Sequence, residues 1–544
     1  MAATTTRPLF LGLDLSTQQL KGVIIGQDSE IVHESAVHFD NDLPSYGTKN
    51  GAIKGPGEGE VTSPVTMWLD AVDLLMERLK AAGVSFSDIV AISGAGQQHG
   101  SVYWSAEAER LLANLDASRS LKSQLSGAFS LPRAPIWQDS STSKECQELE
   151  AAVGGAQALA DLTGSRAYER FTGSQIAKIR HRYPKEYAST LRISLVSSFV
   201  ASLFLGQFAP IEVSDGSGMN LMNVLTGRWD DKLLETCGGS ALRSKLGPEP
   251  VLGGANLGKL SIWWTMRWGF NPECIVAPFT GDNPATVVAL SGPGDALLSL
   301  GTSTTFLLSI PPAKSAPKRT TTSHLLTHPI TLDAQLAMLC YKNGALTREY
   351  IRDEHASRHW HIFNELVLET PPGNNGRFGL YFTLPEIIPP NVIGNHFFET
   401  GPDGLPVRVD NLPENAHARA VLESQLLSIL SRIEGILPES SLPLHRVLIS
   451  GGGSANDVIR QLIADVFGID VYISSTKEAA ALGGALLAKY AWLLVDNPNT
   501  SFEEMVGGHL AGTTRVATPR ADIHDLYEKL VHVYEQCEEI VIRS

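Results

Sequence analysis

The sequence predicts an α/β protein built from two related domains. Its 544 residues are too many for one hydrophobic core. Strand-like segments alternate with helical patterns from the start of the chain, and the opening strand–turn–strand pattern returns near residue 295. We therefore expect one domain over 8–290 and a second over 291–544, with insertions at about 105–245 and 311–440.

The first domain begins with three short strands, a helix and a fourth strand. Tight polar turns separate the first three apolar runs, which indicates an antiparallel meander. Ser63 and Pro64 suit the start of the helix, because apolar residues at helical spacing follow them. The expected strands are 8–16, 20–26, 30–39 and 88–96. The order βββαβ is typical of actin-like, or ribonuclease H-like, domains.

The second domain is expected to repeat this plan. Residues 295–310 form a strand, a Gly-Thr-Ser-Thr turn and a second strand, in parallel with residues 9–25. Further on, 445–473 has the pattern strand, glycine turn, helix, strand, and 478–493 has the pattern of a small-residue helix. Two such domains predict an active-site cleft between them.

Charge and cysteine usage restrict the partners. The net charge of −15 argues against a nucleic-acid or anionic membrane surface, which would need clustered Lys and Arg. The five cysteines show no paired spacing, which favours a reducing compartment over a disulfide framework or a zinc site. No stretch has the roughly 18 apolar residues of a membrane span. We expect a cytoplasmic protein without nucleic-acid or membrane partners.

The hairpin turn at 12–21 has two interpretations of equal weight. Its polar residues satisfy their own backbone in a solvent-facing turn, or its amides and Thr17 contact phosphate oxygens while Asp14 helps to hold hydrated Mg²⁺. A second turn of the same chemistry contains Gly301, Thr302 and Ser303. Two matching turns in two matching domains favour a polyphosphate site.

The glycine run 451–453 lies between a predicted strand and a predicted helix. It is either a flexible loop capped by Asn456 or a neighbour, or a shelf without side chains on which a purine and its ribose lie. Because it follows the second hairpin in the order of an actin-like ATPase, we favour a nucleotide shelf that includes Gly452 and Gly453.

Asp282 follows an apolar run and is surrounded by Gly281, Asn283 and Pro284. Proline disfavours helical conformation in the residue before it, here Asn283, so a helix is not expected to run through this stretch. We therefore expect Asp282 in a turn at a strand end, where Gly281 frees the backbone and the carboxylate points into the cleft.

His99 and Arg170 are less clear from the residues alone. A lone histidine is more often a core residue, but His99 follows two glutamines on a glycine-flanked turn, which suits recognition of hydroxyl groups. Arg170 has the pattern of a surface arginine paired with Glu169.

Five segments, taken in order, resemble the FGGY family of carbohydrate kinases. They are GLDLSTQQLK, SGAGQQHGSVYW, FTGDNPA, LSLGTSTT and ISGGGSAND. The resemblance is strongest to members that phosphorylate D-xylulose, and it covers about residues 8–535. It implies D-xylulose and ATP as substrates, Mg²⁺ as cofactor, and a monomer or weak homodimer. A kinase of another ketose such as ribulose, and a non-catalytic actin-like ATP-binding module, are the alternatives.

The resemblance also implies roles for individual residues. Asp282 matches the base that accepts the proton of the sugar's terminal hydroxyl, and Asn283, His99 and Arg170 match positions that hold the ketopentose, which reverses the surface interpretation of Arg170. The expected nucleotide contacts are Gly452, Gly453, Asn456 and Trp360. Many bacterial relatives have an arginine after WQD, where this chain has Ser140 and Ser141, so the role of Asp139 stays open.

Overall fold

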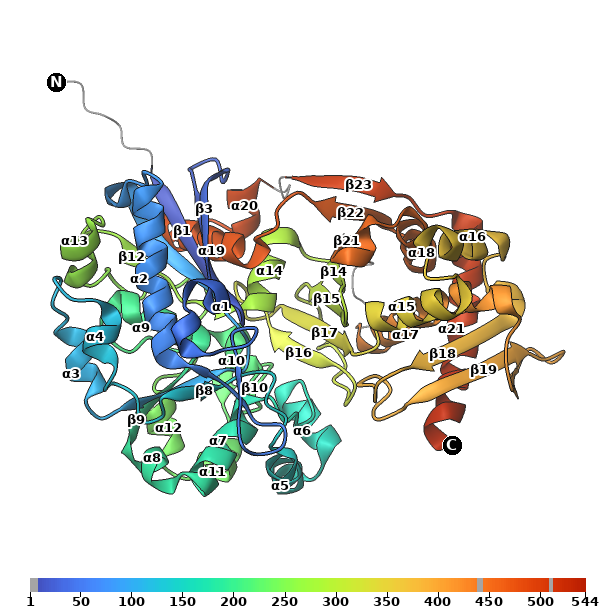
Figure 1. The fold of residues 1–544 in the computed structure, drawn as a ribbon, viewed down its shortest axis with the longest axis horizontal. Helices are drawn as coiled ribbons and strands as arrows, with labels where there is room; N and C mark the ends of the chain where they lie inside the picture. Colours follow the sequence, from blue (N-terminus) through green and yellow to red (C-terminus); the bar gives the residue numbers. More distant parts are fainter. Residues whose placement is uncertain (1–7, 438–443, 508–511) are drawn as a thin grey trace. The chain divides into compact units, whose positions relative to one another are not determined.

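A computed structural model of the chain describes residues 8–437, 444–507 and 512–544, which form two compact units (Figure 1). The first unit runs to Leu290 and includes Leu325–Gln335 and the segment that begins at Glu478. The second comprises Ser291–His324, Leu336–Lys477 and the C-terminal segment. The segment that begins at Glu478 therefore packs with the first unit.

The first unit is built on a mixed sheet. Its strands are β1 (Leu9–Leu15), β2 (Gln19–Ile25), β3 (Ile31–His38), β6 (Ile89–Gly96), β12 (Ile275–Val276) and β13 (Thr280–Gly281). The order is β12-β6-β1-β2-β3, and β13 also pairs with β6. β1 is antiparallel to β2 and parallel to β6, while β13 is parallel to β6. The expected meander and fourth strand are confirmed.

Helices cover both faces of this sheet. α2 (Val65–Ala81) and α9 (Val196–Leu205) pack with Leu11 and Leu13 of β1, whereas α19 (Ala479–Asp496) packs with Phe10. Because side chains alternate along a strand, Gly12 and Asp14 share the face of Phe10. A Cβ at Gly12 would lie 2.0 Å from the carbonyl oxygen of Ala481. The α19 backbone thus packs directly against β1.

Ser63 does not cap the first long helix. It lies in β5 (Val61–Pro64), and its hydroxyl donates to the carbonyl of Gly51 over 2.8 Å. α2 begins at Val65 with Pro64 at the N-cap. Proline has no N–H to donate. Pro64 therefore suits the end of a strand and the N-cap of a helix, where no bond within the helix needs that N–H.

The remaining elements of the first unit lie mostly in its insertion. The strands are β4 (Ile53–Lys54), β7 (Ser101–Ser105), β8 (Arg133–Pro135), β9 (Thr190–Leu195), β10 (Met222–Asn223) and β11 (Arg228–Trp229). The helices are α1 (Phe39–Asp42), α3 (Ala108–Ala113), α4 (Leu121–Leu125), α5 (Ser143–Val153), α6 (Ala156–Thr163), α7 (Thr172–Arg182), α8 (Pro184–Ser189), α10 (Val213–Ser217), α11 (Asp231–Gly238), α12 (Leu242–Leu246), α13 (Ile262–Trp268) and α14 (Asp282–Leu290), with α20 (Phe502–Val506) near the end of the unit.

The second unit repeats the hairpin and the parallel neighbour. Its main strands are β14 (Asp295–Leu300), β15 (Thr304–Ile310), β17 (Gln335–Tyr341), β21 (Arg446–Ser450), β22 (Asp470–Ser474) and β23 (Thr513–Ala517), in the order β17-β15-β14-β21-β22-β23. β14 is antiparallel to β15 and parallel to β21, as β1 is to β2 and β6. The expected internal repeat is therefore present in the strand pairing.

Helices and a small antiparallel sheet complete the second unit. They are α15 (Ala345–His355), α16 (Trp360–Glu369), α17 (His417–Ile436), α18 (Asp457–Phe467), α21 (Ala521–Arg543), β18 (Arg377–Phe382), β19 (Gly394–Thr400) and β20 (Pro406–Val409). α21 packs with α17 and α18 and buries Tyr527, Val531 and Tyr534.

One described helix, α19, is long and apolar enough to cross a membrane by length and composition. More than half of its residues are buried within the fold, as in a core helix that packs on a sheet.

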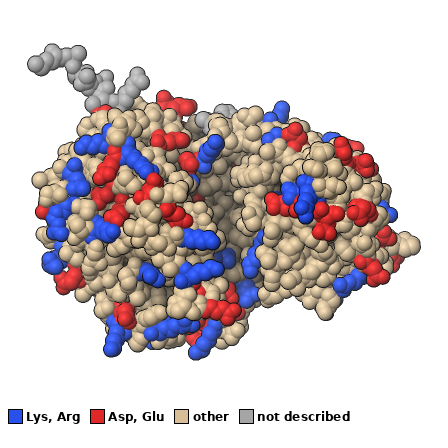
Figure 2. Space-filling view, in the orientation of Figure 1, with Lys and Arg blue, Asp and Glu red and all other residues tan. Residues whose placement is uncertain are grey.

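On the face drawn in Figure 2, basic and acidic side chains are interspersed.

Candidate active site

Three parallel strand ends bring the predicted first-domain residues together. Asp14 lies near the end of β1, His99 follows β6, and Asp282 follows β13. The pairing register places Asp14 beside Ala95 of β6, and Ala95 beside Thr280 of β13. Carboxyl ends of parallel strands are where open α/β sheets bind ligands. The sheet therefore carries the three side chains to one edge.

Asp282 occupies the first position of α14. We expected a turn outside any helix, but Pro284 falls in the first helical turn, where the N–H groups have no partner within the helix. The Asp282 carboxylate accepts a hydrogen bond from the Asn283 N–H at 2.9 Å, and the Asn283 side chain donates to Gln98 at 2.9 Å. A helix N-terminus also stabilises a negative charge. The carboxylate is thus fixed in place at the strand end.

The carboxyl of Asp14 acts on that of Asp282. Burial and, to a smaller extent, the negative charge of Asp14 together raise the pKa of Asp282 to about 7. Burial also raises the pKa of Asp14 to about 6, against the lowering effects of the Ser16 hydroxyl, which donates over 2.6 Å, and of Lys21. Two crowded carboxyls favour a cation between or beside them.

The donor set of Asp14 fits a hydrated divalent cation. Its Oδ1 is buried and has no hydrogen-bond partner among the described residues. In the part of the chain that the structure describes, no three or more His, Cys, Asp and Glu side chains are grouped so that they could hold a metal ion by themselves. Mg²⁺ keeps several waters and takes one or two protein carboxylates, together with phosphates of the substrate. Asp14 therefore suits Mg²⁺ held mainly by water and a nucleotide.

Several polar atoms of this unit are buried and have no hydrogen-bond partner in the described part of the chain. Among them are Gln97 Nε2, Gln98 Nε2 and Asp215 Oδ1, on residues at or beside the strand ends. Buried polar groups are normally hydrogen-bonded, so a set without partners next to Asp282 indicates a polar ligand. We did not select these residues as site residues from the sequence. The polar GQQHG turn was the available signal for the glutamines, and nothing in the sequence marked Asp215.

His99 is held as a hydrogen-bond acceptor. Its Nδ1 lies 2.9 Å from the carbonyl oxygen of Gly218, and its ring stacks on Phe171 with 4.4 Å between centroids. A carbonyl only accepts, so Nδ1 carries the proton. Burial and, to a smaller extent, the charge of Arg170 together lower the pKa of His99 to about 3. The neutral ring therefore leaves Nε2 as an acceptor for a ligand hydroxyl.

Arg170 lies close to this ring. Its guanidinium carbon is 4.8 Å from the centre of the Tyr168 ring and 5.5 Å from that of Phe171. Its charge acts on His99, as the lowered pKa of the histidine indicates. The structure thus brings Arg170 and His99 together, as the family resemblance implied.

Asp139 is held by an ion pair and several hydrogen bonds within the first unit. Its buried carboxylate forms an ion pair with Lys178 at 3.0 Å and accepts hydrogen bonds from the side chains of Gln175 and Ser141 at 2.8 and 2.7 Å. It also accepts from the N–H of Val61. With its hydrogen-bonding capacity used in this way, Asp139 fixes the loop after β8.

The same loop contacts the first hairpin. Trp137 donates from its indole N–H to the hydroxyl of Thr17 at 2.8 Å, and that hydroxyl donates to Gln97 at 3.4 Å. Thr17 therefore links the β1–β2 turn to the turn after β6.

In the second unit, the hairpin and the glycine run lie at one sheet edge. Ser299 of β14 pairs with Ser450 of β21, so Gly301 and Gly451 leave parallel strands side by side. A Cβ at Gly451 would lie 2.9 Å from the carbonyl carbon of Leu300, and Gly451 has a φ of +82°. Only glycine fits this position without strain. The turn Gly301–Ser303 and the loop with Gly452 and Gly453 are thus adjacent.

Asn456 and Trp360 are linked through α16. The Asn456 side chain caps α18 by accepting from the N–H groups of Val458 and Ile459, and its amide donates to Asn364 at 2.8 Å. Asn364 lies one turn after Trp360 on the same helix. The glycine loop, Asn456 and the start of α16 therefore form one neighbourhood.

Glu212 gives a test of the electrostatics around Asp282. It is fully buried, caps α10, and accepts a hydrogen bond from Thr280, two residues before Asp282. Burial raises its pKa from 4.5 to about 7. The folded state therefore binds this proton more tightly, and the resulting stability is lost as the pH rises from about 4.5 through about 7.

The Glu212→Gln variant should lose less stability than wild type over this pH range. Each pKa unit is worth about 1.36 kcal/mol, so the difference between the two proteins should change by on the order of 3 kcal/mol between pH 4.5 and pH 8. Urea unfolding of both proteins across this range measures it. Parallel curves would show that Glu212 does not titrate as its burial requires.

Comparisons with known proteins identify the family of this chain. The FGGY family of carbohydrate kinases matches through its N-terminal domain at 129–289 and its C-terminal domain at 296–492. D-xylulose kinase A of Aspergillus niger is 44% identical over 92% of both chains, and the probable D-xylulose kinase A of Aspergillus fumigatus is 42% identical over 99% of both.

Solved structures of xylulose kinases show the same fold. That from Rhodospirillum rubrum has a TM-score of 0.78 at 17% identity, covering 98% of this chain and 99% of its own. Ligand-bound xylulose kinase from Lactobacillus acidophilus has a TM-score of 0.77 at 17% identity, covering 99% of both chains. The expected two-domain, actin-like α/β class is confirmed. With relatives more than 40% identical over nearly its whole length, this chain belongs to the FGGY family of carbohydrate kinases.

Proposed function

We propose that this protein transfers the γ-phosphoryl group of ATP to D-xylulose and forms D-xylulose 5-phosphate. The observation that carries the substrate is the similarity, over nearly the whole chain, to proteins named D-xylulose kinase. The polar strand-end site around Asp282 supports the reaction type, because phosphoryl transfer needs positioned carboxylates and donors more than covalent chemistry.

In this proposal the first unit binds the ketose. His99 accepts a hydrogen bond from a sugar hydroxyl through Nε2, while Arg170 and Asn283 donate to other sugar oxygens. Asp282 accepts the proton of the terminal hydroxyl as the oxygen bonds to phosphorus. A late proton transfer does not require a strong base, and a pKa near 7 suits a base that works at neutral pH.

The nucleotide is proposed to lie on residues of both hairpins and of the glycine loop. Thr17 contacts phosphate oxygens, and Asp14 holds hydrated Mg²⁺, which when bound neutralises phosphate charge. The other proposed nucleotide contacts are Gly301, Thr302, Ser303, Gly452, Gly453, Asn456 and Trp360. An interdomain cleft stays a prediction, as do the boundaries 8–290 and 291–544.

A coupled assay of ADP release with Mg²⁺ and ATP tests the function. D-Xylulose, D-ribulose, L-ribulose, glycerol and no sugar are compared at equal concentrations. We expect release that depends on D-xylulose. A preference for another ketose would keep the mechanism and change the substrate, whereas ATP binding without sugar-dependent release would favour a non-catalytic module.

The proposal includes a cytoplasmic protein that is a monomer or weak homodimer. All five cysteines are free thiols, in agreement with a reducing compartment. Light scattering of the purified protein at several concentrations determines the oligomeric state.

A further inference from the structure

Arg348 is a buried cation with one nitrogen that has no hydrogen-bond partner in the described part of the chain. Its side chain, on α15, is 2% exposed, and it forms no ion pair among the described residues. Nη1 donates to the Gln425 side chain at 2.8 Å, whereas Nη2 is buried without a hydrogen-bond partner in the described chain. Burial lowers its pKa to about 10, against the raising effect of the Glu349 charge, so the group is still charged at neutral pH. A buried charged donor without a hydrogen-bond partner is costly and indicates an absent acceptor, for which an anion is best suited.

The location of Arg348 identifies where that anion lies. A Cβ at Gly453 would be 3.5 Å from Nη2, so the guanidinium lies directly beneath the glycine loop. The start of α15 also contacts the second hairpin, because the Ala345 N–H donates to the carbonyl of Gly301 at 2.9 Å. Arg348 therefore lies between the hairpin and the loop that we assign to the nucleotide.

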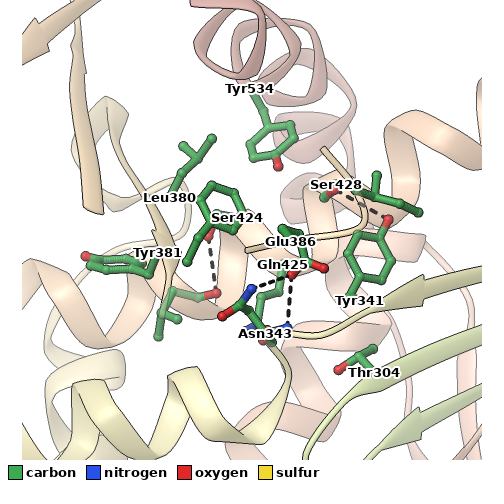
Figure 3. A pocket seen from close by; sticks show the side chains of 13 residues that line it. Thr304, Tyr341, Asn343, Leu380, Tyr381, Glu386, Ser424, Gln425, Ser428 and Tyr534 are labelled. Atoms are coloured by element: carbon green, nitrogen blue, oxygen red, sulfur yellow. Dashed lines mark hydrogen bonds between the residues drawn. The ribbon is translucent and has the colours of Figure 1, made fainter. Parts of the chain in front are cut away.

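Gln425 fixes the direction of the guanidinium. Its amide N–H groups donate to the carbonyls of Asn343 and Gly344 at 2.8 and 3.2 Å, which leaves its oxygen for Arg348. A cavity of about 30 Å³ borders Gln425, Asn343 and Thr304 (Figure 3), but Arg348 does not line it, and it holds no more than water.

Glu386, an acidic residue that lines this cavity, already has hydrogen-bond partners. It accepts hydrogen bonds from the N–H groups of Lys342 and Asn343 and from the Asn343 side chain. It is therefore satisfied without Arg348. The unpaired nitrogen lies beside the glycine loop instead.

We propose that Arg348 is a positioning residue that supplies a buried positive charge beneath the nucleotide's phosphate groups. This inference rests on the proposed function, since it requires a nucleotide on the glycine loop. The absence of side chains at Gly452 and Gly453 keeps the phosphates near enough to feel the charge, and low polarity around the guanidinium strengthens the attraction.

Calorimetric titration of the full-length protein with ADP and with adenosine tests this role. Arg348→Met should weaken ADP binding on the order of tenfold or more and leave adenosine binding nearly unchanged. Arg348→Lys, which keeps the charge, should recover much of the ADP affinity. In turnover, KM for ATP should rise in Arg348→Met while KM for D-xylulose stays close to wild type.

Arg419→Met is the matched control. Arg419 is also buried in the second unit, but it is paired with Glu423 at 3.1 Å. Its loss should lower Tm clearly without changing ADP affinity, because it leaves a buried carboxylate unpaired. Arg348→Met should change Tm much less, since it removes a charge that lacks a partner.

The outcomes separate this inference from the proposed function. If wild type binds no ADP, the proposed function fails. If wild type binds ADP and Arg348→Met binds it equally well, or loses ADP and adenosine affinity alike, the role of Arg348 is wrong. A loss of folding in Arg348→Met as severe as in Arg419→Met would also contradict it, because it would show a structural role.

Discussion

The Asp282→Asn variant is expected to lose roughly 10²- to 10⁴-fold in kcat, with a smaller change in KM for D-xylulose. Asparagine keeps the size of the side chain and its oxygen acceptor for the Asn283 N–H, but it cannot accept the hydroxyl proton at neutral pH. Steady-state ADP release at saturating ATP and varied D-xylulose measures both constants.

Asp231→Asn is a suitable control for this experiment. Asp231 is also the first residue of a helix in the first unit, but its side chain is 85% exposed and pairs with Arg243 on the surface. It should retain wild-type kcat. If Asp282→Asn did the same, Asp282 would not be the base.

The Gly483→Ala variant is expected to be strongly destabilised. Gly483 lies on α19, and a Cβ there would come within 1.9 Å of the Ala285 carbonyl oxygen on α14. A helix backbone cannot yield as a side chain does, so the two helices must separate. Overpacking of this kind costs about 1–3 kcal/mol or more, which lowers Tm by roughly 2–4 °C per kcal/mol. Because α14 begins at Asp282, kcat should also fall.

Gly435→Ala provides the comparison. Gly435 is likewise inside a helix, α17, but nothing lies within 4 Å of a Cβ at this position. Alanine should therefore raise stability by up to about 1 kcal/mol through its helix propensity. Thermal unfolding of both variants measures the contrast. Equal Tm changes would show that α14 and α19 are not in close contact.

Local patterns predicted much of this fold. Alternating apolar residues and polar turns located β1, β2 and β3. The pattern of residues 445–473 predicted a strand, a glycine turn and a helix, which are present as β21 and α18. These elements follow from periodicity and from the fixed preferences of glycine and asparagine.

Features that depend on contacts between distant segments were not predictable. The sequence of α19 shows small residues, but not that Gly483 and Gly484 pack on α14 and β6 of the first unit. The role of Asp139 depends on Lys178, and the proton position on His99 depends on Gly218. Side-chain partners so far apart in sequence are set by the tertiary fold.

The site was predictable in its residue types more than in its geometry. The family resemblance selected Asp282, His99 and Arg170, and the strand register then explained why they converge. The resemblance did not select Gln97, Gln98 or Arg348. A buried atom without a hydrogen-bond partner can be identified only from the three-dimensional structure.

Phosphorus NMR of the reaction products tests the central claim most directly. Purified protein is incubated with Mg²⁺, ATP and D-xylulose, and the phosphorus signals are followed with time. We predict a sugar phosphate monoester at a terminal carbon that forms in equal amount to ADP and only with D-xylulose present. ADP accompanied by inorganic phosphate alone, or unchanged ATP with an active-site nucleotide still bound, would contradict the assignment of a D-xylulose kinase.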